Sequence, residues 1–139
     1  MNILVIDAQG GGVGRQLVSA IKEAFPEMIV TAVGTNSAAT TAMRKAGADA
    51  VATGENAVVV GCRKADIIVG PIGIVIADSL LGEITPAMAV AVGQSSARRL
   101  LLPMNHCDNI VVGVGDLNLS RLVQRVIEEI GMYRIEKGD

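Results

Sequence analysis

The feature that most restricts the fold of this 139-residue chain is its regular alternation of short apolar runs with amphipathic segments. Residues 2–7, NILVID, are predicted to form a buried strand, and residues 13–25 carry apolar side chains at helical spacing. The same two patterns return along the whole chain. Further strands are predicted at 28–33, 50–53, 66–70, 99–104 and 109–114. Further helices are predicted at 37–46, after Asn56 as far as Lys64, at 86–97 and at 117–131.

This alternation predicts an α/β fold. Neighbouring parallel strands need crossover connections, which are right-handed and here are helical. We therefore expect one Rossmann-like domain over residues 1–139: a doubly wound, mostly parallel sheet of about six strands, with helices on both faces. Half of the residues are apolar, yet Phe25 and Tyr133 are the only aromatic residues. Small branched side chains suit a sheet that is buried on both faces. Residues 132–139 are predicted to be a solvated tail.

Two helix starts are predicted from capping residues. Asn36 or Ser37 is expected to cap the helix at 37–46, and Thr85 to cap the next, with Pro86 in its first position. The segment AMAVAV within the latter alternates as a strand does. A helix is favoured because the next strand follows directly and needs a crossover before it.

Charge and hydropathy exclude several classes of partner. The formal net charge is −2 and no more than two basic residues are adjacent, so we expect no nucleic-acid partner.

The N-terminus lacks a signal-peptide pattern, and polar residues, Gly and Pro interrupt the apolar region 67–97, so we expect neither export nor a membrane span. Cys62 and Cys107 form no spacing motif and fit a reducing, cytoplasmic compartment. The mean hydropathy of +0.48 predicts a homo-oligomer.

The candidate binding site centres on VIDAQGGGVGRQL, residues 5–17, where a strand meets a helix across four glycines. Glycine lets the backbone approach an anion closely, and the amides and dipole of the helix N-terminus favour negative charge. In a parallel sheet, ligands bind beyond the carboxyl ends of the strands. We therefore expect a nucleotide or another phosphorylated small molecule here. The predicted binding residues are Asp7, Gln9, Gly10, Gly11, Gly12, Val13, Gly14, Arg15, Thr35, Asn36, Ser37, Pro71 and Gly73.

The loop departs from the known phosphate-binding patterns. In the dinucleotide pattern G-x-G-x-x-G, Gln9 takes the first position, and in the short-chain dehydrogenase loop Gln16 replaces the last glycine. In the ATPase P-loop, Arg15 and Gln16 replace the lysine and the hydroxyl residue. The loop can therefore also be a tight turn that binds nothing. Asp7 would repel a phosphate unless a metal, a proton or the helix N-terminus offsets its charge.

The sequence has no acidic residue where a dinucleotide site would bind a ribose hydroxyl. Thr35, Asn36 and Ser37 occupy that position, after the second strand. Because such donors tolerate a 2'-phosphate, NADP is favoured over NAD if a nicotinamide cofactor binds.

Two further groups carry candidate chemistry. Asp78 and Glu83 are the only charged residues between positions 67 and 97, and as weak catalytic candidates they could form an acid/base pair or a Mg²⁺ site. The simpler interpretation is that Asp78 caps a short helix and Glu83 lies in a loop. His106 and Cys107 are adjacent, which suits neither a zinc site nor a nucleophile with its base, so we expect no metal site. A small enzyme, or an oligomeric structural or regulatory protein without a ligand, remains an alternative to the binding protein.

The chain resembles a family of short bacterial proteins that is defined as a Rossmann-like domain of unknown function. The resemblance spans nearly the whole chain and lies in the blocks MNILVIDAQGGGVG, GPIGIVIADSLLGEITP and LLLPMNHCDNIVVGV. It implies the fold and a bacterial cytoplasmic origin. It implies no activity, so it assigns no catalytic residue.

Overall fold

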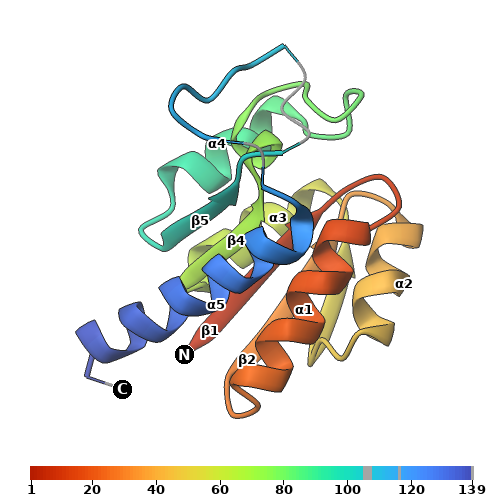
Figure 1. The fold of residues 1–139 in the computed structure, drawn as a ribbon. Helices are drawn as coiled ribbons and strands as arrows, with labels where there is room; N and C mark the ends of the chain where they lie inside the picture. Colours follow the sequence, from red (N-terminus) through yellow and green to blue (C-terminus); the bar gives the residue numbers. More distant parts are fainter. Residues whose placement is uncertain (105–107, 116, 139) are drawn as a thin grey trace.

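The computed structural model describes residues 1–104, 108–115 and 117–138 (Figure 1). They form a three-layer α/β domain. Its strands are β1 Asn2–Asp7, β2 Ile29–Gly34, β3 Ala50–Thr53, β4 Ile67–Pro71 and β5 Arg98–Leu102. Its helices are α1 Gly12–Ala24, α2 Ser37–Lys45, α3 Glu55–Lys64, the 3-10 turn η1 Ile72–Val75, α4 Pro86–Gln94 and α5 Leu119–Glu136.

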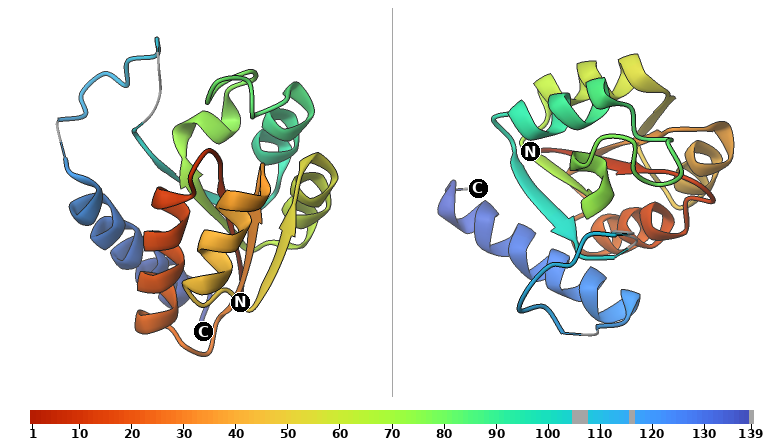
Figure 2. Two further views of the ribbon diagram at one scale, coloured as in Figure 1. Left: turned by 90° about the vertical axis from the view of Figure 1, so that its right-hand side faces the viewer. Right: turned by 90° about the horizontal axis from the view of Figure 1, so that it is seen from above.

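The five strands form one parallel sheet in the order β3-β2-β1-β4-β5. Successive residues of β1 point to opposite faces, so Ile3 and Val5 join one apolar core and Leu4 and Ile6 join the other. Helices α1, α2 and α5 pack on the first face, and α3 and α4 cover the second. Figure 2 (right) shows α1 and α5 on one side of the sheet and α3 and α4 on the other.

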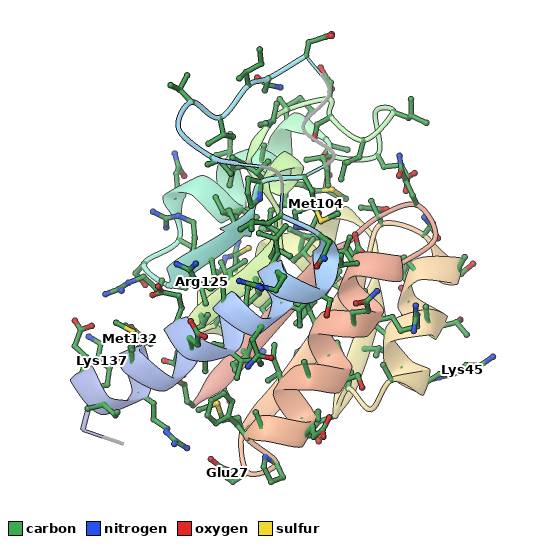
Figure 3. All side chains as sticks on the ribbon, in the orientation of Figure 1. Glu27, Lys45, Met104, Arg125, Met132 and Lys137 are labelled. Atoms are coloured by element: carbon green, nitrogen blue, oxygen red, sulfur yellow. The ribbon has the colours of Figure 1, made fainter. Side chains whose placement is uncertain are left out.

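The side chains follow this layering. Figure 3 shows Lys45 and Lys137 pointing outward, away from the sheet. Apolar side chains of α1 and α5, including Leu17, Ile21 and Ile130, are fully buried between these helices and the sheet. Burying one such side chain contributes about 1.5–3 kcal/mol, so the small aliphatic residues supply a core almost without aromatic rings.

The predicted caps of α2 and α4 are both confirmed. Asn36, rather than Ser37, caps α2: its side-chain oxygen accepts a hydrogen bond from the Ala39 amide at 2.9 Å. Thr85 caps α4 by accepting from the Met88 amide at 3.2 Å, and Pro86 occupies the first turn. The segment AMAVAV is therefore helical, although α4 ends at Gln94 and not at 97.

The predicted sixth strand at 109–114 is wrong. These residues follow no regular structure, and Ile110 and Val112 are 84% and 91% exposed. Strand β5 ends at Leu102, and the stretch from 103 to 108 is too short for the crossover that another parallel strand would need. The segment 108–115 instead projects from the body of the domain (Figure 2, left).

The last helix is longer than the sequence pattern predicts. Helix α5 runs from Leu119 to Glu136, so residues 132–136 are helical and do not form a separate tail. Tyr133 packs against the core of the first face, and the guanidinium of Arg98 lies 4.6 Å from its ring centroid. Arg134 also pairs with Glu27 at 3.0 Å. Within the described part of the chain, no helix has the length and apolarity to cross a membrane.

Candidate functional site

The glycine-rich loop lies at the carboxyl edge of the sheet, where the strand order reverses. Strand β1 sits between β2 and β4, and residues 8–11 connect its end to α1. A pocket of about 220 Å³ opens at this loop. The residues that line it are Asp7, Ala8, Gln9, Gly10, Gly11, Gly12, Val13, Gln16, Leu80 and Leu119. Topological switch points of this kind are where open α/β sheets bind ligands.

Two glycines of the loop are explained by packing. Gly11 has φ +74°, and a Cβ there would lie 2.8 Å from Cα of Ala39 in α2. A Cβ on Gly14 would lie 2.5 Å from the sulfur of Met43 and 2.8 Å from Cβ of Asp7. Both positions therefore need glycine so that α1 can pack closely against α2 and the end of β1.

Gly10 and Gly12 have no such explanation. A Cβ at either position would meet nothing within 4 Å, and neither residue has a left-handed φ. Within the described part of the chain, neither amide donates to a protein acceptor. The absence of side chains here leaves open backbone facing the pocket.

The Asp7 carboxylate ties the end of β1 to the first turn of α1. The residue is 4% exposed, its Oδ1 accepts from the Ala8 amide at 2.8 Å, and its Oδ2 accepts from the Gly14 amide at 2.6 Å. Burial raises the pKa of Asp7 above its ordinary value, the two amides lower it, and the nearby Glu83 raises it further. The amide of Gly14 is thus already bonded within the protein.

Glu83 reaches the same edge from the segment before α4. Its Oε1 accepts from Oγ1 of Thr35 at 2.6 Å, Nδ2 of Asn36 at 2.8 Å and the Gln9 amide at 3.0 Å. The Thr35 hydroxyl and the Gln9 amide hold the pKa of Glu83 below its ordinary value. Nδ2 of Asn36 also donates to the carbonyl of Gln9 at 2.9 Å. One carboxylate oxygen therefore joins the loops that follow β1 and β2.

The other predicted site residues are dispersed. Arg15 and Ser37 are exposed, and neither they nor Pro71 and Gly73 line the pocket of the glycine loop. A Cβ on Gly73 would meet the side chains of Ser79 and Leu80, so this glycine serves local packing.

Asp78 shares none of the hydrogen bonds that hold the Glu83 carboxylate. It is exposed, and among the described residues its carboxylate has no partner. It caps no helix, because its φ of +64° and the bond from its amide to the Ile84 carbonyl at 2.7 Å place it inside a tight loop. Of the two acids, only Glu83 has hydrogen-bond partners for its carboxylate among the described residues, so the acid/base pair stays a prediction. His106 and Cys107 lie outside the described residues, among which no group of three His, Cys, Asp or Glu side chains could hold a metal ion.

Four pocket residues were not predicted from the sequence, and the first is Ala8, which directly follows the end of β1. Gln16 follows Gly12 by one helical turn, a spacing that could have identified it. Leu80 and Leu119 come from the segment before α4 and from the first turn of α5. No local pattern relates them to the glycine loop, because only the packing of the domain brings them together.

A parallel sheet in this order, with a glycine-rich strand-to-helix loop at its switch point, defines a Rossmann-like α/β protein. Residues 2–134 match the family "Domain of unknown function (DUF3842)", and the chain belongs to that family. No curated protein matches the sequence.

One solved structure similar to this chain is a dodecameric FMN-dependent UbiX-like decarboxylase from Escherichia coli O157:H7. The identity is 18% and the TM-score 0.48, over 94% of this chain and 95% of that chain. The similarity is too low to inform on ligand or assembly.

Proposed function

We propose that the protein binds a phosphorylated small molecule of the nucleotide class at the glycine-rich loop, with the phosphate on the amides of Gly10 and Gly12. The observation that carries this proposal is the contrast within the loop. Gly11 and Gly14 are required by packing, whereas Gly10 and Gly12 line the pocket, need glycine for no packing reason, and have amides that bond no acceptor among the described residues.

The surroundings of these two amides favour an anion. Gly12 begins α1, a helix of 13 residues, and its N-cap residue Gly11 provides no side-chain cap. The N-terminus of such a helix carries a partial positive charge and orphan amide donors, which suit a phosphate oxygen. A volume of about 220 Å³ accommodates a phosphate and its nearest atoms, so the remainder of the ligand would extend along the sheet edge.

The negative charge of Asp7 is the main electrostatic obstacle to this proposal, and the surroundings of Asp7 reduce its effect. Oδ2 accepts the Gly14 amide in the first turn of α1, Oδ1 accepts the Ala8 amide just after β1, and burial raises the pKa of Asp7. Burial favours the uncharged acid, whereas the amide dipoles keep the carboxylate charged but offset part of that charge, so both reduce the repulsion that a phosphate would meet. The helix N-terminus is one of the three offsets, with a metal ion and a proton, that would let Asp7 and a phosphate coexist.

The test is the affinity of AMP for the wild type and for Gly12→Val, measured by isothermal titration calorimetry. A Cβ at Gly12 would have nothing within 4 Å, so the fold should be kept, and the side chain would stand where the phosphate is proposed to bind, so AMP binding should fall at least tenfold. The matched control is Gly93→Val, an exposed glycine of α4 that also has nothing within 4 Å of its Cβ position. The control should bind AMP as the wild type does. Equal affinity in the wild type and Gly12→Val, or no binding to the wild type, would reject the proposal.

A further inference from the structure

The Glu83 carboxylate lies beside the end of β2, where the residues that directly follow the strand include no acid. In Rossmann-like sites the phosphate lies at the first helix, and the adjoining sugar lies over the end of the second strand, where an acidic side chain accepts its hydroxyls. Thr35 and Asn36 directly follow β2 here, and no acid stands among them. The structure supplies the acid from another part of the chain, because these two side chains bind Glu83 at 2.6 and 2.8 Å.

The hydrogen bonds around Glu83 leave one of its oxygens free. All three donors bond Oε1, and within the described part of the chain nothing bonds Oε2. A carboxylate that is fixed through one oxygen presents the other as a preorganised acceptor. The donors to Oε1 are the amide of Gln9, within the glycine-rich loop, and the side chains of Thr35 and Asn36, so the carboxylate lies between that loop and the end of β2.

We propose that Glu83 is a specificity-determining residue. Its Oε2 accepts hydrogen bonds from the hydroxyls of the sugar that carries the bound phosphate, and its charge excludes ligands that carry a second phosphate at the 2' position. This inference rests on the proposed function. It reverses the preference for NADP over NAD that Thr35 and Asn36 suggest from the sequence.

Thr35 and Asn36 act in this account as positioning residues. Asn36 is fully engaged, because Oδ1 caps α2 at Ala39 while Nδ2 donates to Glu83 and to the Gln9 carbonyl. The Thr35 hydroxyl donates to Glu83 as well. These donors hold a carboxylate and are not available to a ligand phosphate.

The segment that carries Glu83 is held in an uncommon backbone conformation. Leu80 and Leu81 have φ of +54° and +58°, and Gly82 follows at +82°. Left-handed backbone at non-glycine residues is strained and persists only where surrounding contacts fix it. Leu80 is buried and lines the pocket, so the glutamate is anchored on both sides of this turn.

The test compares AMP, 2'-deoxy-AMP and adenosine 2',5'-bisphosphate on the wild type, on Glu83→Gln and on the control Asp78→Asn. Glutamine can still accept the three hydrogen bonds through its amide oxygen, but it lacks the charge. We expect the wild type to bind AMP at least tenfold more tightly than either analogue, the size of one hydrogen bond to a charged group. Glu83→Gln should reduce the discrimination against the bisphosphate about tenfold, and Asp78→Asn, an exposed acid of the same segment, should leave it unchanged. Thermal melts confirm that each variant is folded.

The outcomes separate the two proposals. If AMP binds in a Gly12-dependent way but the bisphosphate binds equally or more tightly, the role of Glu83 is overturned and the proposed function stands. If Glu83→Gln increases the affinity for AMP and for the bisphosphate alike, the Glu83 side chain blocks the site and ligands displace it, which also overturns the inference. If none of the three nucleotides binds the wild type, the proposed function is rejected, and the role of Glu83, which rests on it, is rejected with it.

Discussion

The division of the loop glycines into two kinds can be tested by stability alone. Replacing Gly11 by alanine puts a side chain into a left-handed backbone, which costs about 1–2 kcal/mol, and pushes Cβ to 2.8 Å from Cα of Ala39. Overpacking against backbone costs about a further 1–3 kcal/mol. The variant should therefore lose roughly 2–5 kcal/mol of unfolding free energy, a large part of what a domain of this size has.

The two neighbouring positions should behave differently. At Gly14 the crowded atoms belong to the Asp7 and Met43 side chains, so the overpacking cost of about 1–3 kcal/mol is partly offset by the helix propensity of alanine, worth about 1 kcal/mol. At Gly12 nothing is crowded, so Gly12→Ala should be neutral or up to about 1 kcal/mol more stable than the wild type.

The assay is urea unfolding followed by circular dichroism, with the midpoints compared at an unchanged slope. Gly93→Ala in α4 is the matched control for helix propensity without the loop. If Gly12→Ala destabilises the protein as much as Gly11→Ala, the loop is structural throughout, and the open amides give no reason to expect a ligand.

Two further predictions concern acidity and assembly. The pKa of Glu83 is lowered from its ordinary value of 4.5, so its carboxylate contributes its full stabilisation at a pH above 4.5. This contribution is lost as the pH falls through the lowered pKa. The difference in urea midpoint between the wild type and Glu83→Gln should therefore shrink between pH 7 and pH 3, and a constant difference would contradict the contacts of Glu83. Exposed apolar surface at Ile110 and Val112 leads us to expect contact with a second copy of the chain. Val112→Asp should then lower the molar mass measured by light scattering, and an unchanged mass would exclude this segment from a subunit contact.

Local sequence patterns predicted most of the secondary structure. The boundaries of β1 and β3 are as predicted, and the caps Asn36 and Thr85 are confirmed, because periodicity and capping act within a few residues. The errors arise where distant packing decides. The β-branched run at 109–114 has strand propensity but no crossover to place it beside the sheet, and α5 extends past 131 because Tyr133 contacts the core.

The candidate site shows the same limit. The glycine-rich loop and its place at the sheet edge follow from the strand-to-helix pattern around residues 5–17. The sequence does not distinguish Gly10 and Gly12 from Gly11 and Gly14, because that difference depends on the approach of α2. The partners of Glu83 also could not be predicted, since 47 residues separate it from Asn36 and no periodicity spans that distance.

The most direct test of the account is an AMP titration of ¹⁵N-labelled protein, following the backbone amide signals by heteronuclear NMR. Binding as proposed should shift the amide signals of Gly10 and Gly12 most strongly, with smaller changes at Gln9 and Thr35 and none at Gly93. A titration that leaves the Gly10 and Gly12 signals in place, or that moves signals elsewhere on the domain instead, would contradict the assignment of these open amides as a phosphate site.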